Sequence, residues 1–91
     1  MKLRLDRDSV CAGDDIDSHE ELRRFECQMK FGAVIASVLS SGYLPHMAHP
    51  DAVWVLRVNG TPQGIIPGLT MDPVFAEDPS RELLAVMSST E

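Results

Sequence analysis

The chain has 91 residues and a formal net charge of −6, with apolar and aromatic fractions of 44% and 5%. This length allows a single domain over residues 1–91, with a small core packed mainly from aliphatic side chains. Residues 1–8 alternate charged and apolar side chains, unlike a secretory signal or a transit peptide. The longest apolar stretch, residues 33–39, is far shorter than the roughly 20 residues of a membrane span. We therefore expect a cytoplasmic protein in which Cys11 and Cys27 are thiols.

The negative charge is concentrated near the N-terminus. Residues 6–26 contain eight acidic and three basic residues, which gives this segment a net charge of −5. Such a segment repels phosphate backbones and anionic lipid, and it accelerates encounter with a basic protein. The composition therefore argues against nucleic-acid and membrane binding and favours a basic protein partner. For any single carboxylate, a solubilising role is the simpler interpretation.

The first half of the chain predicts a strand, a long loop, a second strand and a helix. Residues 2–6 alternate charged residues with leucines, as in a strand with one buried face. Residues 8–19 contain glycine and paired aspartates, which favour a loop. Residues 18–29 fit either a helix with a capping box or a strand antiparallel to the first, and we prefer the strand. Residues 32–41 form an apolar stripe that only a helix brings together, with Gly42 placed as its C-terminal cap.

The second half predicts a strand pair and one short final element. Residues 52–58 are almost entirely apolar, which indicates a central strand. Asn59-Gly60 is a turn signal, and residues 63–66 can return as a strand, with Thr61 and Pro62 lengthening the connection. In residues 68–91 the signals are sparse, and the final element is helical or extended, with Ser80 as its cap. Its residues are RELLAVM.

These elements predict an α+β fold, in which one main helix packs on a small mixed sheet of four strands. The ββαββ order resembles the β-grasp, or ubiquitin-like, arrangement. The rival is another α+β sandwich in which residues 18–29 form a second helix. The C-terminal residues SSTE lack a diglycine tail, so we do not expect a covalent modifier.

The tract SVCAGDDIDSH, residues 9–19, contains the chain's best candidates for chemistry. It offers soft, hard and borderline metal ligands within nine positions, and His46 and His49 add an HxxH pair. The spacing matches neither a zinc framework nor a calcium loop. A thiolate would also need an electropositive setting, whereas this is the most acidic part of the chain. We therefore expect no catalytic, cofactor or metal residues. A small metal- or thiol-site protein stays open as an alternative, using Cys11, Asp14, Asp15 and His19.

SVCAGDD at residues 9–15, followed by His19, YLP at 43–45 and WVL at 54–56, resembles a group of short, uncharacterised bacterial proteins with an SVCxGDD tract and a nearby histidine. The resemblance covers the chain up to Pro67. Proteins of this sort are often encoded beside toxins, so it implies an immunity protein or an accessory partner. It is carried by Ser9, Val10, Cys11, Gly13, Asp14, Asp15 and His19.

Charge and resemblance together favour a non-catalytic protein-binding module. We expect an immunity-type inhibitor whose acidic loop occupies the basic cleft of a toxin or nuclease. Two alternatives remain beside the metal or thiol site: a ubiquitin-like accessory protein without conjugation, and a purely structural loop with local side-chain hydrogen bonds. The expected partner-binding residues are Asp14, Asp15, Asp17, His19, Glu20 and Glu21.

Overall fold

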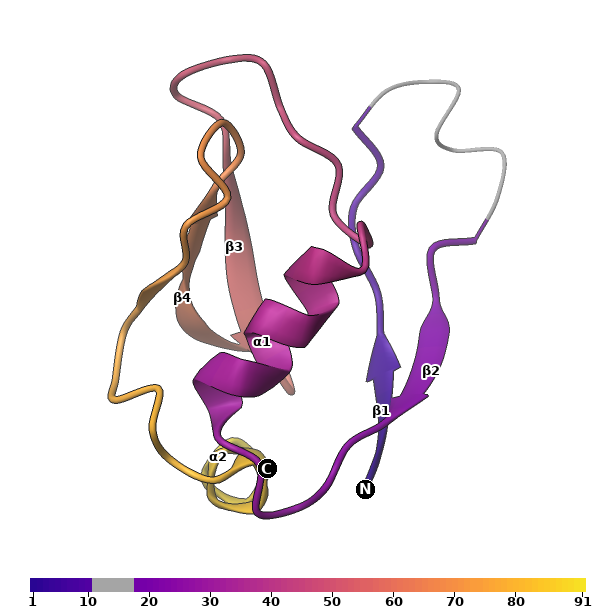
Figure 1. Cartoon of the computed structure of the whole chain (residues 1–91), viewed down its shortest axis with the longest axis vertical. Coiled ribbons are helices and arrows are strands. Elements are labelled where there is room, and N and C mark those ends of the chain that lie inside the picture. Colours follow the sequence, from indigo (N-terminus) through magenta and orange to yellow (C-terminus); the bar gives the residue numbers. More distant parts are fainter. Residues whose placement is uncertain (11–17) are drawn as a thin grey trace.

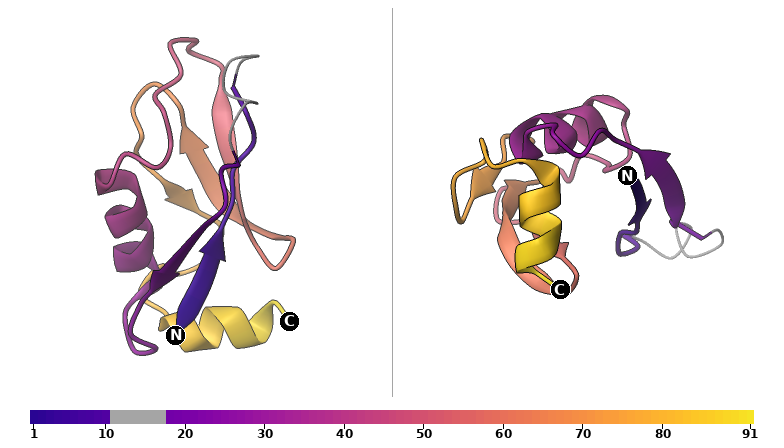
Figure 2. Two further views of the ribbon diagram at one scale, coloured as in Figure 1. Left: turned by 90° about the vertical axis from the view of Figure 1, so that its right-hand side faces the viewer. Right: turned by 90° about the horizontal axis from the view of Figure 1, so that it is seen from below.

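The computed structural model describes residues 1–10 and 18–91 as a small α+β fold (Figure 1). This class is the one expected from the sequence. One helix lies on the same side of two small antiparallel sheets, and a shorter helix crosses one end of the molecule (Figure 2). In chain order the elements are β1 (Lys2–Leu5), β2 (Glu21–Arg24), α1 (Phe31–Ser40), β3 (Val53–Val58), β4 (Thr61–Pro67), β5 (Val74–Phe75) and α2 (Leu83–Ser89).

Strands β1 and β2 form a two-stranded antiparallel ribbon, in which Leu3 pairs with Arg23. The alternation in β1 predicted this strand, because it places Leu3 and Leu5 on one half-buried face. The strand interpretation of residues 18–29 is confirmed over Glu21–Arg24, and the helical alternative is wrong. Beyond β2 the side chains continue to alternate between half-buried and exposed, but the backbone leaves the ladder in a turn before α1.

A two-residue turn, Asn59-Gly60, joins β3 to β4. Its residues have φ values of 51° and 79°, and two positive values are what a type I′ hairpin turn requires. Val58 pairs directly with Thr61 across this turn. The expectation that Thr61 and Pro62 lengthen the connection is therefore wrong, since both residues belong to β4.

The expected single mixed sheet of four strands is also wrong. Strands β3, β4 and β5 form their own antiparallel sheet in that order, and no ladder links it to β1 or β2 among the described residues. A β-grasp fold has one continuous sheet, so the observed topology does not support this resemblance. Strand β3 is an edge strand and not the central one. Trp54 and Leu56 face inward, whereas Val53 and Val55 are exposed, because no described element covers the outer side of this sheet.

Helix α1 supplies the centre of the core, as its apolar stripe predicted. Val34, Ile35 and Val38 are buried, and Phe31 makes an edge-to-face contact with the ring of Phe75, with centroids 5.8 Å apart. Gly42 ends the helix with a φ of 77°, and its N–H bonds to the carbonyl oxygen of Leu39. With ten residues in α1 and seven in α2, neither helix of the described chain has the length and apolarity needed to cross a membrane.

The C-terminal segment, where sequence signals are sparse, contributes the most deeply buried side chains. Leu83 and Val86 of α2 are 1% and 0% exposed. Backbone hydrogen bonds hold this segment against the residues before α1, including Leu83 N–H to the Met29 carbonyl at 2.8 Å. The expected helical cap is wrong: the residue before α2 is Glu82, and the Ser80 N–H instead bonds to a side chain in the preceding turn.

Candidate binding surfaces

The structure describes only some of the expected partner-binding residues. Asp14, Asp15 and Asp17, together with Cys11, lie outside the described residues. His19, Glu20 and Glu21 are described and lie where the chain enters β2. Only this second group can be placed in three dimensions.

The two ends of the SVCAGDDIDSH tract meet. The Ser9 hydroxyl oxygen lies 3.1 Å from His19 Nε2, and the Tyr43 hydroxyl, just beyond α1, donates to the His19 carbonyl oxygen. Burial raises the pKa of Tyr43 above its ordinary value, with a further contribution from the negative charge of Asp6. His19 therefore lies at a junction of three segments.

The two glutamates of the expected partner-binding set each have a basic neighbour. Glu20 Oε1 lies 3.6 Å from Arg4 Nη1 on β1, and the Glu21 carboxylate pairs with Arg23 within β2. Arg23 also lies over the ring of Tyr43, 5.7 Å from its centroid. The ion pairs are largely exposed, so they contribute little to stability, but they reduce the negative charge that a basic partner would meet here.

The remaining candidates for chemistry lie apart. His46 and His49 are exposed on the segment between α1 and β3, and His49 Nδ1 accepts a hydrogen bond from the Asp51 N–H at 3.2 Å. Cys27 is a half-buried free thiol in the turn before α1. In the described ranges, no group of three histidine, cysteine or acidic side chains converges as a metal site would require.

The outer side of the three-stranded sheet bears an exposed apolar surface, which we call the sheet patch. Its four residues are 39% to 58% exposed, and pairing places Val55 beside Ile65 and Ile65 beside Val74 in one row across the strands. Sequence reasoning missed this surface because the almost entirely apolar run in β3 indicates a central strand and not an edge strand with one exposed face. The sheet patch consists of Val53, Val55, Ile65 and Val74.

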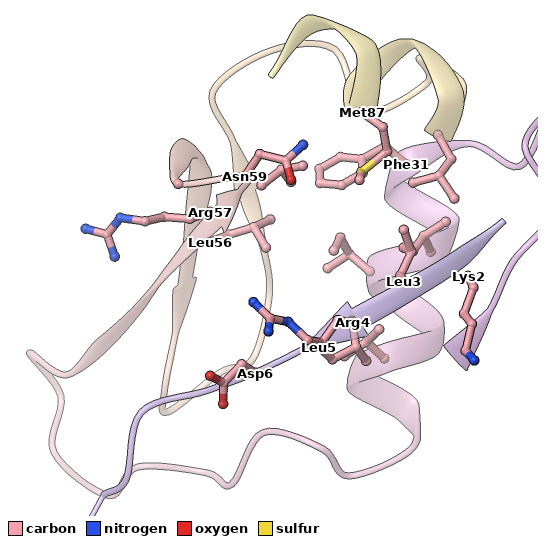
Figure 3. A pocket seen from close by; sticks show the side chains of 16 residues that line it. Lys2, Leu3, Arg4, Leu5, Asp6, Phe31, Leu56, Arg57, Asn59 and Met87 are labelled. Atoms are coloured by element: carbon pink, nitrogen blue, oxygen red, sulfur yellow. The ribbon is translucent and has the colours of Figure 1, made fainter. Parts of the chain in front are cut away.

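A cavity of about 430 Å³ separates β1 from β3, and we call it the strand groove (Figure 3). Residues 2–6 form one wall, residues 56–60 form the other, and the apolar side of α1 forms the floor. A second cavity of about 290 Å³ continues between residues 6–8 and residues 53–57, and the two cavities share Asp6 and Arg57. Trp54 lines the second cavity, and its buried indole N–H finds no hydrogen-bond acceptor within the described part of the chain.

No protein-family model matches the chain, and no curated protein or solved structure is similar to it.

Proposed function

We propose that this chain is a non-catalytic protein-binding module, and that its partner is a basic protein such as a toxin or nuclease, which it inhibits by contact as immunity proteins do. The observation that carries the proposal is the exposed sheet patch with charged groups at its border. Val53 and Val55 belong to the patch, and the cavity that they line also contains two carboxylates and two guanidinium groups, those of Asp6, Asp8, Arg7 and Arg57. An apolar centre bordered by charged groups is the usual construction of a protein interface.

The sheet patch supplies the anchoring part of such an interface. Its side chains are β-branched and are held in register by the β3–β4–β5 ladder. They are therefore already ordered before a partner arrives, which lowers the entropy cost of association. Removing these side chains from water on binding provides a favourable and non-directional contribution to affinity.

The acidic segment supplies steering and specificity. Its net charge of −5 over residues 6–26 attracts a basic surface over distances comparable to the Debye length, about 8 Å at physiological salt. Within this segment we assign the contact to Asp14, Asp15 and Asp17, with His19, Glu20 and Glu21 beside them. Arg4 and Arg23 weaken the contribution of the two glutamates.

The test begins with affinity capture from host cells, followed by binding kinetics with the purified partner. Val74→Lys places a positive charge in the sheet patch and should weaken binding of a basic partner by about tenfold or more, mainly through faster dissociation. Val74→Thr, which retains the β-branched shape, is the matched control. Replacing Asp14, Asp15 and Asp17 together by asparagine should slow association and reduce its dependence on salt.

Three results would contradict the proposal. The first is that affinity capture from host cells yields no partner that binds stoichiometrically, and the second is that the partner binds Val74→Lys as tightly as the wild type. The third is a stoichiometric metal ion, detected by mass spectrometry of the intact protein and lost in His19→Ala, which would favour the metal-site alternative.

A further inference from the structure

Strands β1 and β3 face each other across the strand groove without joining. Among the residues that the structure describes, each is paired along one edge only, β1 with β2 and β3 with β4. The two strands run in opposite directions, and α1 crosses one side of the space between them, the side nearer the viewer in Figure 1. Free strand edges of this kind are templates for the addition of another strand.

The backbone of β1 directs hydrogen-bonding groups into the groove. Met1 and Phe25 exchange two backbone hydrogen bonds, of 2.8 and 2.7 Å. Because such pairs alternate along an antiparallel ladder, the next residues to bond with β2 are Leu3 and Leu5. The N–H and C=O groups of the intervening residues point to the opposite edge. These intervening residues are Lys2 and Arg4.

Strand β3 presents an edge of the same kind. The Gly68 N–H donates to the Ala52 carbonyl at 2.9 Å, and alternation from this pair assigns the even-numbered residues of β3 to bonds with β4. Pro62 and Pro67 of β4 fit this assignment, since both lie opposite odd-numbered residues, where the strand needs no N–H. The backbone groups of the odd-numbered residues point away from β4: those of Arg57 toward the strand groove, and those of Val53 and Val55 toward the second cavity that continues it.

The floor and inner walls of the groove are apolar. Ile35 and Val38 of α1 lie at its base, and the half-buried side chains of Leu3 and Leu56 project inward from the two walls. Successive side chains of a strand point to opposite sides. An added strand would therefore place every second side chain against this apolar base and the others toward solvent.

The outer rim of the groove is basic, in a chain whose net charge is −6. Lys2, Arg4 and Arg57 line the groove and are exposed, and Asp6 is its single acidic residue. Arg4 extends over the space between the strands, and Arg57 projects outward from the opposite wall (Figure 3). Opposite charges on neighbouring strands stabilise a sheet, and like charges destabilise it. An added strand should therefore carry carboxylates on its outward side. Strand β1 of a second copy does not fit, because its outward side chains, Lys2 and Arg4, are basic.

We propose that the strand groove binds an extended segment of another protein as an added strand, with apolar side chains at alternate positions and carboxylates between them. This site goes beyond the proposed function, because it uses the facing edges of β1 and β3 and not the outer side of the three-stranded sheet, and because it selects a partner of opposite charge. Residues 2–6, which form the β1 wall, correspond to about 17 Å of extended chain. A longer strand would continue past Trp54, which lines the second cavity.

The proposal is tested with the capped peptide Val-Glu-Val-Glu-Val-Glu-Val. The control peptides are the same sequence with lysine in place of glutamate, and the glutamate peptide with alternate backbone nitrogens methylated. Binding is followed by the fluorescence of Trp54, the chain's single tryptophan, and by hydrogen exchange of assigned amides in NMR spectra. We expect the glutamate peptide alone to bind and to protect the amides of Lys2, Arg4, Val55 and Arg57.

Two substitutions locate the site. Arg57→Glu should lower the affinity for the glutamate peptide by about fivefold and raise the affinity for the lysine peptide. Val74→Lys, on the sheet patch, should change the affinity for neither peptide. Failure of the groove proposal can therefore be distinguished from failure of the proposed function. The proposal is overturned if the glutamate and lysine peptides bind equally, or if neither binds at millimolar concentration. It is also overturned if the four amides are already protected from exchange in the free protein. Protection that does not depend on protein concentration means that the chain closes the groove itself. Protection that increases with concentration means that a second copy occupies it.

Discussion

Tyr43 connects three parts of the chain through one side chain. Its hydroxyl donates to the His19 carbonyl, and its ring lies beneath the guanidinium of Arg23. Tyr43→Phe removes the hydroxyl and leaves a half-buried carbonyl without this donor. We expect a loss of about 1 kcal/mol in the free energy of unfolding, measured by urea denaturation. Equal stability of the two proteins would show that water replaces the hydroxyl at no cost.

Asp78 is a pH-sensitive residue in the turn before α2. Its Oδ1 accepts a hydrogen bond from the Ser80 N–H at 2.9 Å, and hydrogen bonds from Ser80 hold the pKa of this carboxyl below its ordinary value of 3.8. The stabilisation is therefore present above pH 3.8 and is lost as the pH falls through the lowered pKa. Carboxyl NMR titration should give a midpoint below 3.8, which moves partly back in Ser80→Ala. An ordinary midpoint in the wild type would contradict this prediction.

At the scale of elements, Gly64 sets how closely β4 and β5 approach. A Cβ atom at this position would lie 2.4 Å from the Val74 carbonyl oxygen, so the backbone of one strand would have to move. Gly64→Ala should cost about 2–3 kcal/mol of stability and disrupt the short pairing of β5. Gly60→Ala is the matched control: it also has a positive φ, 79°, but its Cβ would meet nothing within 4 Å. Both free energies come from chemical denaturation, and a Gly64 variant no worse than the Gly60 variant would refute the steric argument.

Helix α2 should be essential although it is short. Leu83→Ala removes a side chain that is 1% exposed and should destabilise the protein by about 2–5 kcal/mol. Leu84→Ala is the control, because Leu84 is 49% exposed and the same change there should cost about 0.5 kcal/mol or less. Thermal denaturation of the two variants gives the comparison. Similar losses would mean that α2 does not belong to the core.

Elements specified by neighbouring residues could be predicted, and the pairing of distant elements could not. The stripe in α1 with Gly42, and the Asn59-Gly60 turn, are local signals. Helix α2 has only seven residues, too few to establish a period, and the two residues of β5 form a strand only because Gly64 allows close approach. The sequence of β1 fits equally well beside β2 or β3, so it could not reveal that the sheet is split.

At the scale of the whole molecule, the candidate surfaces were predicted only in part. Charge pointed to the acidic segment, but not to the basic neighbours of Glu20 and Glu21, since Arg4 comes from a strand distant in sequence. The sheet patch and the strand groove exist because no described element covers the outer side or the free edge of β3. The amino-acid sequence alone does not show which strands stay uncovered. Composition describes the charge that a surface can carry, whereas exposure depends on the complete arrangement of elements.

The split between the two sheets has a consequence for how the molecule melts. The ribbon of β1 and β2 shares no ladder with β3–β4–β5 in the described chain and is attached mainly by side-chain packing. It can therefore separate while the other ladder stays intact, as a partly independent unit of unfolding. In scanning calorimetry the measured enthalpy should then exceed the van't Hoff enthalpy, and a ratio of one would contradict this. A strand bound in the groove would join six strands into one sheet, so occupancy would convert a loosely coupled molecule into a single cooperative unit.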